Sequence, residues 1–174
     1  MAAAERGKCR SCGADLVDWA RVHRRDRTDV AYTFDALRYE LIRHHHWDTP
    51  LDERAINHAR RKGRERLNEA ALRRLTKYLA PARPPRDGYQ TPFSGNAIFY
   101  AQHAVACCCR TCLEYWHGIP KGRALTHDEL DYCIQLVTMF LDQRLPDLGR
   151  LPERVPASHH ALNAMATGEP SEAS

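Results

Sequence analysis

The stretch Cys-Cys-Cys-Arg-Thr-Cys at residues 107–112 does most to decide how this chain folds, because it ends in the pair Cys109 and Cys112. A Cys-x-x-Cys pair places two thiols about one turn apart, so both sulfurs can face one tetrahedral ion. A second pair stands near the start of the chain, at Cys9 and Cys12. The two pairs together predict a structural zinc ion bound by four thiolates.

The first pair is followed by Gly13, which can adopt the left-handed turn that metal-binding knuckles use. A zinc ion shared with the second pair would join the N-terminus to the segment before the last helix. Such an ion can contribute about 10 kcal/mol or more to folding. The alternative is that Cys9 and Cys12 lie on a free arm and bind nothing.

A rival set of metal ligands lies within fifteen residues of the chain. Its members are His103, Cys108, Cys109, Cys112 and His117. Three of them plus a water molecule would form an open site, in which zinc could lower the pKa of the water to about 7. The sequence leaves open whether Cys108, His103 or His117 replaces a cysteine of the four-thiolate set.

The composition is that of an ordinary globular protein. The chain has 174 residues, of which 43% are hydrophobic and 28% are charged, and it carries seven cysteines. No stretch approaches the roughly 20 apolar residues that span a membrane, and the N-terminus lacks the apolar core of a signal peptide. We therefore expect a cytoplasmic protein without membrane contact. Along the chain we expect a flexible arm over residues 1–8, one domain over 9–152 and a disordered tail over 153–174.

The hydrophobic pattern predicts a mainly α domain of about four helices, held together by the zinc knuckles. One helix is expected from Thr33, with Phe34, Leu37, Leu41 and Ile42 on its buried face. The next is expected over 50–79, capped by Thr49.

Two further helices are expected in the second half of the chain. The apolar run 97–106 is too short to assign to strand or helix. A short helix should begin at the second knuckle and end at Gly118. The last helix begins with a capping box formed by Thr126 and Glu129.

The helix expected over 50–79 carries an excess of basic side chains on the face opposite its apolar stripe. Arginine side chains can form paired hydrogen bonds with phosphate, so this face predicts contact with nucleic acid. The residues expected to bind it are Arg60, Arg61, Arg64 and Arg73.

Over roughly residues 79–145 the chain resembles a bacterial family, domain of unknown function 4186. The matching stretches are residues 79–81, 87–92, 100–104, 108–113 and 116–120. The resemblance implies that His103, Cys108, Cys109, Cys112 and His117 belong to one motif. It implies no activity.

A weaker resemblance is to HNH endonucleases, which carry two structural Cys-x-x-Cys knuckles, with Asn96 standing before the second knuckle as the Asn of that motif does. The Asp-His pair usual in that motif is absent here. On this reading His103 and His117 would lie near the metal, and Asp87 or Glu114 would act as acid or base.

Three functions therefore follow from the sequence. The first is a zinc-binding domain that contacts nucleic acid through its basic helix. The second is a metal-dependent nuclease or other hydrolase. The third is a protein–protein adaptor in which zinc is purely structural.

Overall fold

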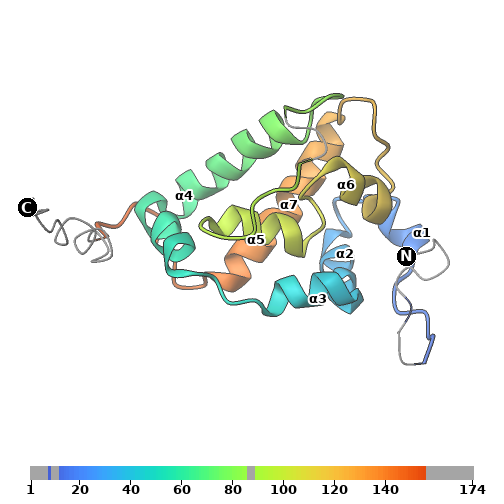
Figure 1. Cartoon of the computed structure of the whole chain (residues 1–174), viewed down its shortest axis with the longest axis horizontal. Helices are drawn as coiled ribbons and strands as arrows, with labels where there is room; N and C mark the ends of the chain where they lie inside the picture. The colour runs from blue at the N-terminus through green and yellow to red at the C-terminus, as the bar shows by residue number, and fades with distance from the viewer. Residues whose placement is uncertain (1–7, 9–11, 86–88, 156–174) are drawn as a thin grey trace, which may run out of the picture.

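The chain folds into a bundle of helices, with the short helix α5 in its middle (Figure 1). The computed structural model describes residues 8, 12–85 and 89–155. The elements are α1 (Trp19–Val22), α2 (Val30–Ala36), the 3-10 helix η2 (Leu37–Tyr39), α3 (Leu41–Asp48), α4 (Glu53–Tyr78), α5 (Ala97–Ala104), α6 (Arg110–His117) and α7 (His127–Arg144).

The prediction of a mainly helical domain is confirmed, although the helices are more numerous and shorter than the four expected. In the described part of the chain the only β-type pairing is an isolated bridge between Lys8 and Asp15. None of the described helices combines the length and the apolar composition needed to cross a membrane. Residues 1–7 and 156–174, which hold most of the predicted arm and tail, lie outside the described residues.

Helix α5 is mostly apolar, which fits its central position, and its polar side chains Gln102 and His103 have hydrogen-bond partners. All of its residues are buried except Phe99, and it packs against α3, α4 and α7. A helix that is hydrophobic all round must be covered on all sides. The side chain of Asn96 caps it by accepting a hydrogen bond from the Ile98 amide at 2.9 Å. The sequence did not decide whether the apolar run 97–106 forms a strand or a helix. The cap at Asn96 starts a helix there, over Ala97–Ala104.

Helix α4 begins three residues later than predicted. Its cap is Asp52, not Thr49, and Asp52 Oδ1 accepts from the Ala55 amide at 2.7 Å. The other carboxylate oxygen accepts from Gly95 N at 2.6 Å and from Tyr100 Oη at 2.8 Å. Thr49 instead closes α3, because its hydroxyl donates to the His45 carbonyl. A single carboxylate thus joins the start of α4 to the start of α5.

The single helix expected from Thr33 is in fact broken at Glu40. Glu40 is extended, and its carboxylate caps α3 by accepting from the Arg43 amide at 2.8 Å. The break rotates the second segment, so Leu41 and Ile42 are exposed, contrary to the prediction, while Trp47 is buried.

The predictions for the second half of the chain are confirmed. Helix α6 ends at Gly118, which has the left-handed φ of 64°. Helix α7 begins with the complete capping box, because Thr126 Oγ1 accepts from Glu129 N and the Glu129 carboxylate accepts from Thr126 N.

Helix α4 changes direction at Gly63, which has φ 66° and ψ 169° (Figure 1). The break frees the Arg64 amide, which donates to the Gly149 carbonyl at 2.9 Å. A Cβ atom at Gly63 would lie 2.5 Å from the Leu151 carbonyl oxygen and 2.7 Å from that of Arg150. The chain after α7 therefore packs against the kink so closely that only glycine fits.

We expect Gly63→Ala to lower the free energy of unfolding by more than about 3 kcal/mol, measured by chemical denaturation. About 1–2 kcal/mol comes from the left-handed φ, and the remainder from overlap with the 150–151 main chain. The matched control is Gly122→Ala, since Gly122 has φ 82° but open space around its Cα. Equal losses in the two variants would contradict the packing argument.

Candidate metal centre

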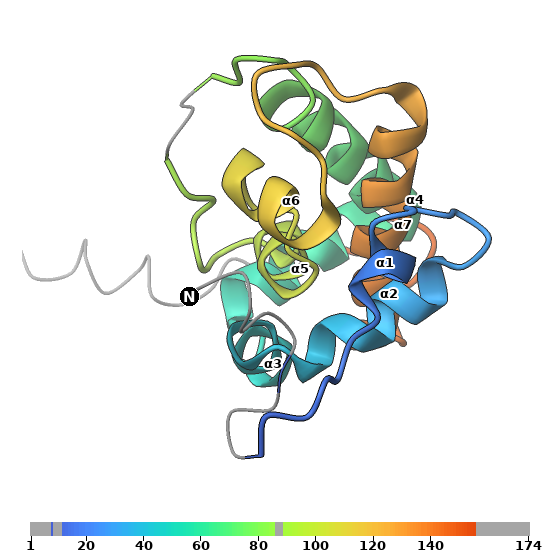
Figure 2. The same ribbon diagram turned by 90° about the vertical axis from the view of Figure 1, so that its right-hand side faces the viewer.

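Three cysteine side chains meet where α6 begins. The sulfur atoms of Cys108, Cys109 and Cys112 all lie within 4.8 Å of one another. Cys108 is buried, and the other two are partly buried. Figure 2 shows α6 lying beside α5, so the cluster occupies the corner between these helices. Thiolates within this distance can bind a single soft cation such as zinc.

The main chain before α6 is held rigidly by hydrogen bonds. Ala106 adopts a left-handed φ of 55° and turns the chain away from α5. The Cys107 amide donates to the Gln102 carbonyl at 2.8 Å, and the Gln102 side chain donates to the Cys107 carbonyl at 2.9 Å. The Thr91 hydroxyl donates to the Cys108 carbonyl at 2.8 Å. These bonds orient the thiols independently of any metal.

The electrostatics of the cluster favour one thiolate, at Cys109. Thiol hydrogen bonds from Cys108 and Cys112 lower the pKa of Cys109, and backbone amides of Cys112 and Thr111 at the start of α6 lower it further. Bonding to Cys109 and Cys112 raises the pKa of Cys108. The hydrogen bond with Cys109 and burial raise the pKa of Cys112 to about 11. Cys109 also caps α6, with its sulfur 3.5 Å from the Cys112 amide.

Two arginines near this corner, Arg43 and Arg110, are buried, which their charge did not predict. Arg43 pairs with Glu40 and donates to the His103 carbonyl, and Arg110 donates to the carbonyls of Leu79, Pro120 and Arg123. Arg43 lies four residues before Trp47, so the two share one face of α3. This spacing is the one sequence signal that could have predicted the burial of Arg43.

The predicted four-thiolate set is only partly within the described residues. Cys109 and Cys112 come together as expected, and Cys108 joins them. Cys12 is exposed and is not among the described side chains that meet there. Cys9 lies outside the described residues. Gly13 does adopt the predicted left-handed turn, with φ 73°.

His103 is buried in a cluster of three rings, with Phe93 and His46. Its ring stacks on Phe93 at 4.3 Å and on His46 at 4.9 Å between centroids. Its Nε2 donates to the Thr91 carbonyl at 2.9 Å. Burial lowers the pKa of His103, so its ring is neutral at physiological pH. The nitrogen bound to Thr91 is engaged, and the ring serves mainly to pack the loop before α5.

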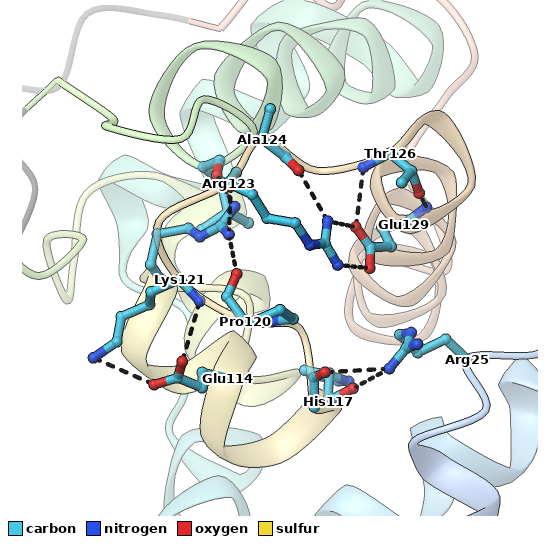
Figure 3. Close-up of polar contacts among 12 residues, drawn as sticks. Arg25, Glu114, His117, Pro120, Lys121, Arg123, Ala124, Thr126 and Glu129 are labelled. Carbon is cyan, nitrogen blue, oxygen red and sulfur yellow. Dashed lines mark hydrogen bonds and ion pairs between the residues drawn. The ribbon is translucent and has the colours of Figure 1, made fainter.

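His117 and Glu114 both have structural partners. Figure 3 shows Lys121 bonded to Glu114 and Arg25 bonded to the main-chain carbonyl of His117. The fully buried His117 donates from Nε2 to the Val105 carbonyl and accepts at Nδ1 from Tyr132 Oη, both at 3.0 Å. Burial lowers the pKa of His117 to about 4. Neither ring nitrogen is left for a metal.

Glu114 lies on the exposed side of α6 and does not act as a proton donor at neutral pH. It accepts from the Lys121 amide at 3.1 Å and pairs with the Lys121 ammonium at 3.3 Å. The amide bond lowers the pKa of Glu114. Asp87, the other predicted acid or base, lies outside the described residues.

The predicted basic face of α4 is smaller than expected. Arg64 is not on it, because its guanidinium bonds to Asp142 and to the Leu145 carbonyl and so fastens α4 to the end of α7. Arg60, Arg61 and Arg73 are exposed, although Arg73 lies 3.4 Å from Glu69.

Comparison with known proteins places this arrangement in a family. No solved structure matches the chain. The family model described as a domain of unknown function (DUF4186) matches residues 31–142. The matched segment begins within α2 and ends within α7, so it contains the whole cysteine cluster and excludes Cys9 and Cys12. The chain belongs to the DUF4186 family.

Proposed function

We propose that this domain binds one zinc ion through Cys108, Cys109 and Cys112, and that the ion stabilises the corner between α5 and α6. The observation that carries the proposal is the approach of the three sulfur atoms to within 4.8 Å of one another. Thiolate ligands favour zinc among the common divalent ions. The nearby hydrogen bonds hold the thiols in place before metal arrives, which reduces the ordering cost of binding.

Tetrahedral zinc needs a fourth ligand, which we propose is a thiol of the first knuckle. The left-handed φ of Gly13 supports this, because a metal-binding knuckle uses such a turn directly after its second ligand. Only one of the two N-terminal thiols is then needed, since Cys108 supplies the third local sulfur. The family match covers neither Cys9 nor Cys12, which fits a site whose essential ligands are Cys108, Cys109 and Cys112.

Substitution of Cys108 separates this proposal from a site made of Cys9, Cys12, Cys109 and Cys112. We expect Cys108→Ser to lose most of the bound zinc, as measured by mass spectrometry of metal content and by the thiolate charge-transfer bands of the cobalt form. The matched control is Cys133→Ala, a buried cysteine of α7 outside the cluster, which should keep one zinc per chain. Full zinc content in Cys108→Ser would refute the local site.

Removal of the metal should loosen the fold. A structural zinc ion can contribute about 10 kcal/mol or more. Each kcal/mol corresponds to roughly 2–4 °C in Tm for a chain of this size. We therefore expect a chelator to lower Tm by more than about 10 °C, with recovery when zinc is restored. A metal-free protein with unchanged Tm would show that the cluster has no structural metal.

A second candidate function is nucleic-acid binding through α4. The observation in its favour is that Arg61 and Arg66 are exposed and have no ion pair with any described residue. Arg64 bonds to the end of α7, so it is no longer one of the arginines expected to bind nucleic acid. The hydrolase alternative has less support, because His117 and Glu114 are engaged structurally.

Charge reversal tests the nucleic-acid proposal. We expect the double variant Arg61→Glu/Arg66→Glu to abolish binding of duplex DNA or RNA in a gel-shift titration at low salt, with Tm unchanged. In the unaltered protein the affinity should fall with salt, with a log–log slope of about −0.9 for each phosphate neutralised on duplex DNA. Absence of binding by the unaltered protein would favour the adaptor function, in which zinc is purely structural.

A further inference from the structure

A cavity of about 590 Å³ lies beside the cysteine cluster. Cys108 and Cys109 form one wall, and Arg74, Tyr78 and Phe99 line another. Small-molecule sites typically measure about 300–1,000 Å³ and combine aromatic side chains with a few polar groups. Both the size and the lining of this cavity are therefore those of a ligand site.

Arg74 is held in the cavity wall by neutral partners. Its guanidinium carbon lies 4.3 Å from the centre of the Phe99 ring and 5.2 Å from that of Tyr78. Its Nε donates to Gln102 Oε1 at 2.6 Å, and one terminal nitrogen lies 3.4 Å from Thr91 Oγ1. These contacts fix the plane of the group and leave N–H donors of its terminal nitrogens without a strong acceptor.

Arg74 also has no carboxylate partner among the residues that the structure describes. Some other half-buried arginines do have one, such as Arg21 with Asp29 and Arg123 with Glu129, whereas Arg144 bonds only to main-chain carbonyls. Burial without a counter-charge lowers the pKa of Arg74. An anion in the cavity would supply the missing charge, and a guanidinium fork matches the geometry of carboxylate and phosphate.

The remaining lining agrees with a ligand of this kind. The described residues around the cavity include no Asp or Glu. Arg110 also lines the cavity, but its guanidinium already donates to three main-chain carbonyls. Tyr89 adds an exposed ring beside those of Tyr78 and Phe99. Three aromatic rings in the lining of one cavity favour a ligand that is apolar or planar apart from its charged group.

We propose that this cavity binds a small organic oxyanion, with its carboxylate or phosphate at Arg74 and an apolar or ring-shaped body against Tyr78 and Phe99. The proposal goes beyond zinc binding and shares with it only the wall formed by Cys108 and Cys109. Each can therefore hold without the other.

The test is calorimetric titration of the zinc-loaded protein with benzoate, phenyl phosphate and uncharged benzyl alcohol. One of the two anions should bind saturably and more tightly than the alcohol, and the preferred anion identifies the oxyanion. Arg74→Gln should weaken that binding roughly 10- to 100-fold, as expected for the loss of a charged hydrogen bond. The matched control Arg73→Gln, one residue away and exposed, should bind as the unaltered protein does.

Far-UV circular dichroism and zinc content are measured on every variant, so that loss of folding or of metal is seen separately. If Arg74→Gln does not fold, Tyr78→Ala provides the second test, since removal of a lining ring should weaken the preferred anion several-fold. The proposal is overturned if neither anion binds saturably to folded protein. It is also overturned if Arg74→Gln folds and binds as tightly as Arg73→Gln. Unaltered protein that binds the anion but contains no zinc would instead overturn the zinc proposal alone.

Discussion

The left-handed turn at Ala106 is the constraint on which the cysteine cluster and its surroundings depend. Its φ of 55° costs a residue with a side chain about 1–2 kcal/mol. Gln102 offsets this cost, because both its main-chain carbonyl and its side-chain amide bond to the main chain of Cys107. The turn reverses the chain directly after α5, and this reversal brings Cys108 and Cys109 to the first turn of α6.

Buried arginines hold together the segments that lack regular structure around this corner. Carbonyl groups at helix ends have no partner within their own helix, and burying them unpaired is costly. Arg110 satisfies the Leu79 carbonyl after α4 together with two carbonyls of the loop before α7. Arg144 donates to the carbonyls of Trp47 and Thr49 at the end of α3. Part of the arginine content of the chain therefore serves the internal structure.

The proposed metal centre and the cavity share two residues, Cys108 and Cys109. A change at Cys108 would affect both, because this residue lines the cavity and also belongs to the cluster. The hydrogen bond from Thr91 to the Cys108 carbonyl extends this link to the loop before α5.

Local patterns in the sequence were enough to determine the helical class, the capping box at Thr126, the end of α6 at Gly118 and the meeting of Cys109 with Cys112. Each of these depends on residues within four positions of one another, where spacing dictates geometry. Only the tertiary structure decided the kink at Gly63, the burial of Arg43, the pairing of Arg64 with Asp142, the entry of Cys108 into the cluster and the structural role of His117. Those features depend on which distant segment supplies a partner, such as Leu151 for Gly63 or Asp142 for Arg64. A residue's type and its neighbours in sequence do not specify that partner, since packing of the whole chain selects it.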